Sequence, residues 1–399
     1  MSNDNLGAAK KAKNDEFYTQ YEDIEKEMNA YLDYDKNVFK NKTILLPCDD
    51  PEWSNFTKYF AQNFEKLGLK KLISTSYAPN SKNLDDLFAP TEYEIGSLKY
   101  DKSKSESNGR IFTLTKDTNK DKRIDFRDIE WDYLEGDGDF RSEELIALRD
   151  ESDIVITNPP FSLFRAFLSW IIEGNKRFAV IGNMNAITYK ETFPIIQRNE
   201  MWLGATNFNV GMYFAVPPGF VYAPTYKFER TKNGQAVNRV PGVCWFTNLE
   251  HGRRHKPMPL MTMADNVKFS KHKEVKDVGY QKYDNYDAIE VPFADAIPSD
   301  HEGVMGVPIS FLDKYNPEQF EILGATQRGC HDLVPDTKKY DSYWEVRPNG
   351  SPTGSSGGKT NENANIAGND GKKNYFENSD GHIVQSAYQR IFIRHRKPA

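Results

Sequence analysis

A strand that runs straight into two consecutive prolines is the feature that most constrains how this chain folds. Residues 153–161 read DIVITNPPF, an apolar, β-branched run that ends in Asn158, Pro159, Pro160 and Phe161. Each proline fixes φ and lacks an N–H group, so the pair stiffens the turn and ends the strand. In an open α/β sheet, such a turn lies at the carboxyl end of a strand, where these sheets bind ligands. The alternative is a proline turn that only ends the strand.

Apolar runs and helical stripes alternate through the first half of the chain. We predict strands at residues 43–46, 72–75, 111–114, 154–157 and 178–181, with helices between them. A further apolar stripe predicts an N-terminal helix on the same domain, and its members are Tyr21, Ile24, Met28, Tyr31 and Leu32. This alternation is typical of a parallel sheet covered by helices, so the expected fold class is α/β. Residues 80–109 are polar and are expected to form an insertion or a long loop.

The texture of the sequence changes after about residue 201. Short strand-like pieces at 212–216 and 243–247 are broken by Pro and Gly, and helices no longer alternate with them regularly. We therefore predict two domains, residues 1–204 and 205–399. Within the second, residues 349–381 are dominated by Gly, Ser, Asn and Lys, which predicts a long exposed loop before a final strand.

The charge of the chain restricts its partners. Lys and Arg number 52 against 58 Asp and Glu, and the net charge of −6 counts against nucleic-acid binding, which needs a basic face. Basic residues are nevertheless clustered in HGRRHK (251–256) and in RIFIRHRKPA at the carboxyl terminus. Each cluster is either a nucleic-acid contact or a solvated segment. Three dispersed cysteines, no secretory h-region and no apolar run near the ~20 residues of a membrane span predict a cytoplasmic protein without membrane contact.

The residues of the Asn-Pro-Pro-Phe turn suit one kind of chemistry. An amino group on an aromatic base is a weak nucleophile because its lone pair is delocalised, and two acceptors placed on its hydrogens re-localise that pair. The Asn158 side-chain oxygen and the Pro159 carbonyl can supply both acceptors, and Phe161 can stack on the base. Such an amino group lies inside the base stack of duplex DNA, so the base has to be flipped out first.

The strand followed by NPPF resembles motif IV of the amino-methyltransferases that use S-adenosylmethionine. PCDDPEWSNFTKYF (47–60), TNPPFSLF (157–164), IGNMNAITYKE (181–191) and CWFTNLEHGRRH (244–255) together resemble the EcoRI-type adenine-specific DNA methyltransferases, over nearly the whole chain. The resemblance implies a Rossmann-like, S-adenosylmethionine-dependent sheet in residues 1–204 and a mixed target-recognition region in residues 205–399. It also implies S-adenosyl-L-methionine as cofactor, double-stranded DNA as substrate and the N6 amino group of adenine as acceptor. The enzyme would be a monomer that protects against a restriction endonuclease without forming a stable complex with it.

Two further motifs are recognised through this resemblance. Asp139 and Phe140, in GDGDFRS, resemble the Asp-Phe pair of motif III, which lines the base and the cofactor adenine. Phe17, Tyr18 and Thr19 resemble motif X, which closes over the methionine end of the cofactor. A Gly-rich acidic turn is the plainer interpretation of the first, and a hydrophobic staple at a helix start explains the aromatic residues of the second equally well.

The segment after the first strand departs from the common pattern of the S-adenosylmethionine-dependent amino-methyltransferases, and this departure narrows the resemblance to the EcoRI-type enzymes. LPCDDPEWSNF follows this strand without the glycines of motif I, and ISTSY (73–77) lacks the usual acidic residue after the second strand. Pro47, Cys48, Asp49 and Asp50 are the cofactor-binding candidates at this position, although either aspartate could instead cap the next helix.

Six basic residues are the candidates for contacts with DNA phosphates. They are Arg253, Arg254, Lys256, Arg394, Arg396 and Lys397. Three other functions stay open at this point: a methyltransferase for guanine in RNA or glutamine in protein, an inactive DNA-binding module, and a nuclease. The nuclease alternative is built on Pro335, Asp336, Glu345 and Arg347.

Overall fold

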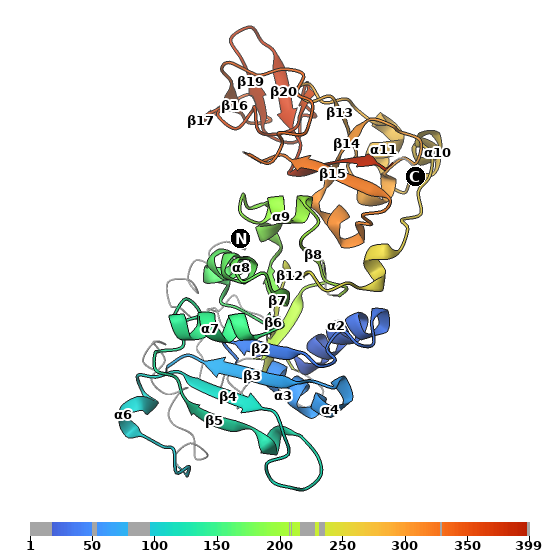
Figure 1. The fold of residues 1–399 in the computed structure, drawn as a ribbon. Coiled ribbons are helices and arrows are strands. Elements are labelled where there is room, and N and C mark those ends of the chain that lie inside the picture. The colour runs from blue at the N-terminus through green and yellow to red at the C-terminus, as the bar shows by residue number, and fades with distance from the viewer. Residues whose placement is uncertain are drawn as a thin grey trace. The chain divides into compact units, whose positions relative to one another are not determined.

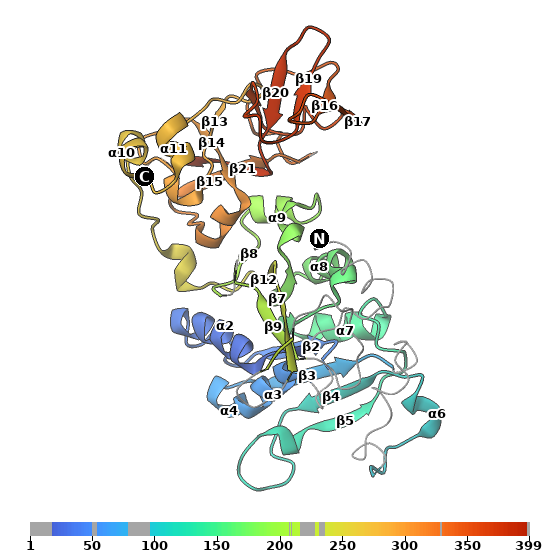
Figure 2. The same ribbon diagram turned by 180° about the vertical axis from the view of Figure 1, so that it is seen from behind.

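The structure is a computed structural model that describes residues 18–49, 54–78, 96–206, 208, 210–215, 228–230, 236–327 and 329–396. It divides the chain into two compact units. Unit 1 consists of residues 1–186 and 201–252, and unit 2 consists of residues 187–200 and 253–399. Their helices and strands can be followed from opposite sides in Figure 1 and Figure 2.

An eight-stranded sheet forms the centre of unit 1, in the order β5-β4-β3-β2-β6-β7-β12-β8 (Figure 1). The middle strands are parallel: β3 (Lys71–Ser76), β2 (Thr43–Pro47), β6 (Ile154–Thr157) and β7 (Arg177–Asn183). The flanking strands run antiparallel to their neighbours: β4 (Arg110–Leu114), β5 (Glu130–Tyr133), β12 (Val243–Thr247) and β8 (Trp202–Leu203). Every residue of β2 and β6 is buried, as expected for strands covered on both faces.

The α/β fold class and the five strands expected from the sequence are confirmed, and the sheet is mixed, with the expected parallel strands in its middle and antiparallel strands beside them. β4 lies antiparallel to β3, and β12 returns antiparallel beside β7. Apolar periodicity identifies a buried strand, whereas its direction depends on how the connecting segment brings it back to the sheet. The direction of these two strands was therefore not readable from the sequence.

Helices of unit 1 pack on this sheet through one large apolar cluster. α2 (Tyr21–Tyr34), α3 (Asn55–Gln62) and α4 (Phe64–Leu67) share it with side chains of β2, β6 and β12. Ile24, Met28 and Tyr31 have no exposed surface, which confirms the N-terminal helix. α7 (Glu143–Glu151) and α8 (Phe164–Glu173) precede and follow β6. Ser54 and Ser142 begin α3 and α7 as N-caps, because their hydroxyls accept backbone N–H bonds.

A smaller antiparallel sheet, in the order β1-β9-β11-β10, completes unit 1. Its strands are β1 (Tyr18–Thr19), β9 (Met212–Ala215), β11 (Ala236–Val240) and β10 (Phe228–Arg230). Residues 205–252 therefore group with unit 1, whereas the sequence placed a domain boundary at 204. The reason is backbone pairing: β9 pairs with β1, and β12 pairs with β7. α6 (Lys102–Ser105) lies in the polar insertion, of which residues 80–95 are outside the described residues.

Unit 2 contains two sheets. The first has the order β13-β14-β21-β15, with β13 (Ala288–Glu290), β14 (Val304–Pro308), β21 (Arg390–His395) and β15 (Phe320–Ala325). The second has the order β17-β16-β19-β20-β18, with β17 (Pro352–Ser356), β16 (Trp344–Val346), β19 (Tyr375–Glu377), β20 (Ile383–Ser386) and β18 (Asn365–Ala367). Its helices are short: α9 (Phe193–Gln197), α10 (Met263–Phe269) and α11 (Lys273–Val278).

The second sheet of unit 2 corrects the expectation of a long loop at residues 349–381. β17, β18 and β19 all lie in that range and pair with β16 and β20. Four glycines of the range that lie outside these strands have φ between 69° and 86°: Gly350, Gly368, Gly371 and Gly381. Glycine adopts this conformation without steric cost, so these residues form turns between short strands. A glycine-rich linker and a sheet with tight turns have similar compositions.

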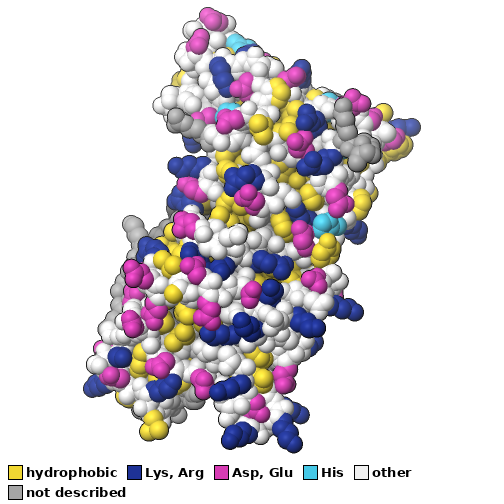
Figure 3. Space-filling model, in the orientation of Figure 1, with side chains coloured by type: hydrophobic (Ala, Val, Ile, Leu, Met, Phe, Trp, Pro, Cys, Tyr) yellow, Lys and Arg dark blue, Asp and Glu magenta, His cyan; other side chains and the backbone are white. Residues whose placement is uncertain are grey.

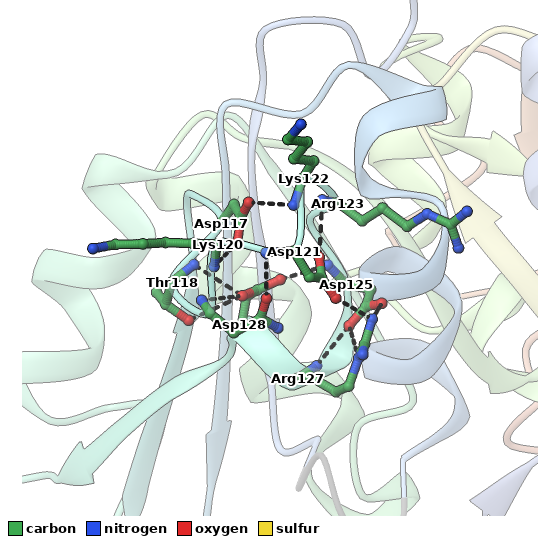
Figure 4. A network of polar contacts seen from close by, with 10 residues as sticks. Asp117, Thr118, Lys120, Asp121, Lys122, Arg123, Asp125, Arg127 and Asp128 are labelled. Carbon is green, nitrogen blue, oxygen red and sulfur yellow. Dashed lines mark hydrogen bonds and ion pairs between the residues drawn. The ribbon is translucent and has the colours of Figure 1, made fainter.

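Side chains of the loop between β4 and β5 accept hydrogen bonds from the loop's own backbone (Figure 4). Asp128 is buried, and its carboxylate accepts the backbone N–H groups of Thr118, Asn119 and Asp125 and the Thr118 hydroxyl, at 2.8–3.1 Å. Arg127 forms an ion pair with Asp125 at 2.8 Å. Burial alone would raise the pKa of Asp128, but the backbone N–H donors outweigh burial and lower that pKa to about 2.

Candidate active site

The Asn-Pro-Pro-Phe turn lies at the carboxyl end of β6, in the middle of the unit 1 sheet. Asn158 is half-buried and its Oδ1 atom is inaccessible to solvent. Pro159 and Pro160 are buried, and Phe161 is half-buried against the main apolar cluster. Phe161 begins a short 3₁₀ helix that leads into α8. The turn is therefore a rigid connection between a buried strand and a packed helix, as the sequence predicts.

The segment after β2, the second predicted site, adjoins this turn. The Thr157 hydroxyl lies 2.6 Å from Asp49 Oδ2 and 2.8 Å from the carbonyl oxygen of Pro47. The other carboxylate oxygen of Asp49 accepts the Ser54 hydroxyl at 2.7 Å. Ser54, rather than Asp49, caps α3, so Asp49 does not take the role of helix cap. Asp50 lies outside the described residues.

The N-terminal segment reaches the same region through α3. The side-chain amide of Asn55, the residue after the cap Ser54, donates to the carbonyl of Thr19 at 2.7 Å. Thr19 is buried, and its hydroxyl has no hydrogen-bond partner among the residues that the structure describes. Of the other two residues predicted here, Phe17 lies outside the described residues, and only the backbone of Tyr18 is described.

The Asp139 turn adjoins the end of β3. The backbone N–H of Ala78 donates to the Asp137 carbonyl at 2.8 Å. Gly138 has a φ of 85°, and a Cβ atom at this position would lie 2.5 Å from the carbonyl oxygen of Ser76. Only glycine allows this close approach. The pair resembling motif III is therefore held against β3 by backbone contacts.

The two residues of that pair differ in their surroundings. The Arg141 side chain donates two hydrogen bonds to the Asp139 carboxylate and lowers its pKa. Phe140 is 1% exposed, with ring centroids 5.1 Å from Phe167 and 5.8 Å from Trp170. A ring so deeply buried packs in the core, which argues against the expected contact of Phe140 with the cofactor. Asp139 keeps its position beside β3.

Two buried hydroxyl groups at the end of β3 were not identified from the sequence. Thr75 and Ser76 are 0% and 3% exposed, and neither hydroxyl has a hydrogen-bond partner among the residues described. The sequence showed only that an acidic residue is missing at this place. Buried hydroxyl groups without a partner cost about 1–3 kcal/mol each, so these two are candidates for hydrogen bonds to a ligand. At the end of β7, Asn183 Oδ1 accepts the backbone N–H of Asn185 at 2.9 Å, a local turn contact.

Arg254, one of the predicted DNA contacts, is buried in unit 2. It is 4% exposed, donates to the side-chain oxygen of Asn199, and places its guanidinium carbon 5.9 Å from the ring centroid of Tyr315. A guanidinium group packed in this way does not reach a phosphate, which argues against the predicted role and for a role in packing. Charge patterns in a sequence do not report burial.

The other predicted DNA contacts are more exposed. Lys256 is exposed, Arg253 pairs with Asp313, Arg394 pairs with Glu321 at 2.8 Å, and Arg396 donates to the Pro317 carbonyl at 2.7 Å. Lys397 lies outside the described residues.

Burial raises the pKa of Tyr315, and the charges of Arg254 and Arg396 oppose that shift. The two basic clusters, distant in sequence, therefore meet in unit 2. Elsewhere, Lys and Arg are interspersed with Asp and Glu on the face seen in Figure 3.

Metal-binding clusters and membrane-spanning helices are both absent from the described part of the chain. No group of three or more His, Cys, Asp or Glu side chains there is arranged to hold a metal ion. No helix there has both the length and the apolar character of a membrane span.

Comparison with known proteins supplies the remaining evidence. The family described as adenine-specific methyltransferase EcoRI matches residues 5–396. The chain is 42% identical to the type II methyltransferase M.EcoRI of Escherichia coli over 323 residues. This matched region covers 80% of this chain and 88% of that relative. The chain is 36% identical to the type II methyltransferase M.MpnI of Mycoplasma pneumoniae over 336 residues, which are 84% of this chain and 89% of that relative. It is 38% identical to the type II methyltransferase M.MgeORF184P of Mycoplasma genitalium, also over 336 residues, which are 84% of this chain and 90% of that relative. No solved structure matches the chain significantly.

Proposed function

The chain belongs to the family of EcoRI adenine-specific methyltransferases, and from this membership we propose that it moves the methyl group of S-adenosylmethionine to N6 of an adenine flipped out of duplex DNA. One observation carries the assignment of the site. The Asn158 turn lies at the carboxyl end of β6, and the loop after β2 lies directly against it through Thr157 and Asp49. The proposed catalytic turn and the proposed cofactor segment therefore lie next to each other, at the ends of the paired strands β6 and β2.

The residues around this boundary fit S-adenosylmethionine. The cofactor is a nucleoside joined to an amino acid through a sulfonium, and its hydroxyl and amino groups need hydrogen-bond partners. The hydroxyls of Thr19, Thr75 and Ser76 are buried and lack partners among the described residues, so they suit such a ligand. Pro47 and Cys48 present the backbone of the first loop at the same end of the sheet. When bound, the cofactor supplies an electrophilic methyl group.

Asn158 and Pro159 activate the acceptor in this proposal. The Oδ1 atom of Asn158 and the carbonyl of Pro159 accept the two hydrogens of the adenine amino group, so that its lone pair turns toward the methyl donor. Pro160 keeps the turn stiff and removes a competing N–H donor. Phe161 stacks on the flipped base and offsets part of the cost of extruding it. Asp139 lies beside β3, where it can accept a further amino group.

Unit 2 is proposed to recognise the DNA target, together with residues 205–252 of the predicted second domain. Lys256, Arg394 and Arg396 are exposed there and are proposed to contact phosphates. The enzyme would act as a monomer on chromosomal DNA in the bacterial cytoplasm. As in type II systems, a restriction endonuclease of the same specificity would be its functional counterpart without a stable complex.

The family membership also bears on the alternatives. An adenine-specific family does not support guanine in RNA or glutamine in protein as the acceptor. The decisive experiment incubates the protein with labelled S-adenosylmethionine and duplex DNA, RNA or release-factor protein, and sequences modified bases in a host that expresses it. Label in N6-methyladenine at one short DNA sequence is the expected result. Label only in RNA or protein, or no transfer at all, would refute the proposal, and the last outcome would favour an inactive binder.

Replacing Asn158 tests its role directly. We expect Asn158→Ala to lower the rate of methyl transfer about 10²–10³-fold while cofactor binding changes little, because one oriented acceptor is lost in the transition state. Asn183→Ala is a matched control, since it removes the same side chain from the end of the neighbouring parallel strand β7 and should keep the rate within about threefold. Single-turnover kinetics and calorimetric titration with the cofactor give the two readouts. Near-normal turnover in Asn158→Ala would contradict the assignment.

A further inference from the structure

We propose that Asp49 is a positioning residue that holds the turn at Cys48 and Asp49, directly after β2, and the catalytic turn after β6 in one fixed arrangement, with Thr157 as its contact. The inference rests on the proposed function, because it needs Asn158 to hold the acceptor amine and the Cys48–Asp49 turn to lie against the methyl donor. It assigns to Asp49 neither of the two roles that its sequence context suggests, cofactor ligand or helix cap.

Asp49 joins four neighbouring elements through buried contacts. Its carboxylate accepts hydroxyls from Ser54, which begins α3, at 2.7 Å and from Thr157, which ends β6, at 2.6 Å. The backbone N–H of Asp49 donates to the Thr75 carbonyl in β3 at 2.8 Å, and the backbone carbonyl of Asp49 accepts the Ser74 hydroxyl. Asp49 itself, which directly follows β2 and Cys48, is 6% exposed, and the other four residues are exposed by 4% or less. One residue thus ties β2, β3, β6 and α3 together where their ends meet.

The turn that Asp49 holds is strained. Cys48, the residue before it, has a φ of 79°, a left-handed conformation that costs a non-glycine residue about 1–2 kcal/mol. Strain of this kind persists only where surrounding contacts over-determine the backbone. The hydrogen bonds of Asp49 provide those contacts. They fix a sharp turn in a segment that contains no glycine, residues 46–56.

Thr157 transmits this arrangement to the catalytic turn. Its hydroxyl lies within hydrogen-bonding distance of both Asp49 Oδ2 and the Pro47 carbonyl, and the next residue is Asn158. Methyl transfer requires donor and acceptor atoms to be aligned within near-attack distance. A small shift between the two segments therefore slows the chemical step while both binding sites remain. A purely structural contact would instead change stability and leave the rate of the folded enzyme unchanged.

The test compares Thr157→Val, which keeps the shape of the side chain and removes its hydroxyl, with Thr157→Ser, which keeps the hydroxyl. Methylation of a duplex that the wild type modifies is followed in a single turnover, and binding of S-adenosylhomocysteine and of the duplex is measured by calorimetry. We expect Thr157→Val to lower the single-turnover rate about 10- to 100-fold with both Kd values within about threefold of the wild type. Thr157→Ser should keep a rate within about threefold.

Thr247→Val is the matched control. Thr247 has no exposed surface, and its hydroxyl donates to the Phe178 carbonyl at 2.7 Å on β12, which is separated from β6 by β7. It should lower the melting temperature about as much as Thr157→Val and leave the rate unchanged. Asp49→Asn, which retains one acceptor oxygen, should also lower the rate, and it carries the test if Thr157→Val does not fold.

Two results would overturn the inference. One is a wild-type single-turnover rate in folded Thr157→Val. The other is a rate loss fully accounted for by weaker cofactor binding, because the hydroxyl would then serve affinity and not alignment. A wild-type protein that methylates no duplex would refute the proposed function itself, and the two failures are therefore distinguishable.

Discussion

Replacing Arg254 tests whether this residue contacts DNA, as its basic sequence context predicts, or supports packing in unit 2, as its burial indicates. Its position in HGRRHK predicts a DNA contact, whereas the structure buries it to 4% exposure against Asn199 and Tyr315. Arg254→Ala removes a hydrogen bond from a charged donor, worth about 1.5–3 kcal/mol, and a cation–π contact, worth about 0.5–2 kcal/mol. We therefore expect a loss of about 3 kcal/mol in the free energy of unfolding of unit 2.

Thermal unfolding measures this loss. For a folding unit of roughly 150–250 residues, 1 kcal/mol corresponds to about 2–4 °C, so the transition of unit 2 should fall by about 6–12 °C. Lys256→Ala, two residues away and exposed, is the control and should change stability by less than about 0.5 kcal/mol. The salt dependence of DNA binding is measured on the same proteins below their transitions.

The two interpretations predict opposite patterns. If Arg254 supports packing, Arg254→Ala melts early and binds DNA with an unchanged salt slope. If it contacts a phosphate, the melting temperature stays and the slope of log K against log salt falls by about 0.9. The second pattern would refute the structural argument for Arg254.

Two other outcomes are expected. Lys256→Gln combined with Arg396→Gln should reduce the salt slope of DNA binding by about 1.8 and lower stability by only about 0.5–1.5 kcal/mol, because Arg396 also donates to the Pro317 carbonyl; an unchanged slope would place the DNA elsewhere. In the β4–β5 loop, the pKa of Asp128 is lowered from 3.8 to about 2, so its contribution to stability is present above about pH 4 and is lost as the pH falls toward 2. Asp128→Asn should therefore speed hydrogen exchange of residues 117–128 by about tenfold at pH 7 and have little effect near pH 2, whereas equal exchange at pH 7 would contradict this role.

The sequence predicts best what depends on apolar burial. β2 and β6 were located to within one residue, because strands buried on both faces are nearly continuous apolar runs. Residues 349–381 were misjudged because glycines that turn a small sheet have the composition of a linker. The direction of the flanking strands was not readable from the sequence, because it is set by connections between strands and not by side chains.

The candidate site was predictable only in part. Asn158 and its prolines were found because a strand that ends in two prolines has a local signature. The role that we infer for Asp49 depends on Thr157, over one hundred residues away, and no local pattern reports such a contact. Thr75 was overlooked for a related reason, since a hydroxyl in a strand is unremarkable until its burial and its lack of a partner are known.

The division of the chain into units also determines when each unit can finish folding during synthesis on the ribosome. Residues 187–200 are synthesised before β8 and β12, yet they belong to the unit whose other residues begin at 253. When β12 emerges, the sheet of unit 1 can be completed, while Phe193, Ile195 and Ile196 of α9, which are buried in the folded protein, still lack the contact of α9 with β15. β15, against which α9 packs, is translated last among these elements. Once residues 1–252 have emerged from the ribosome, the sheet of unit 1 can be complete while α9 is still without β15, and translational pausing or a chaperone would matter most in this state.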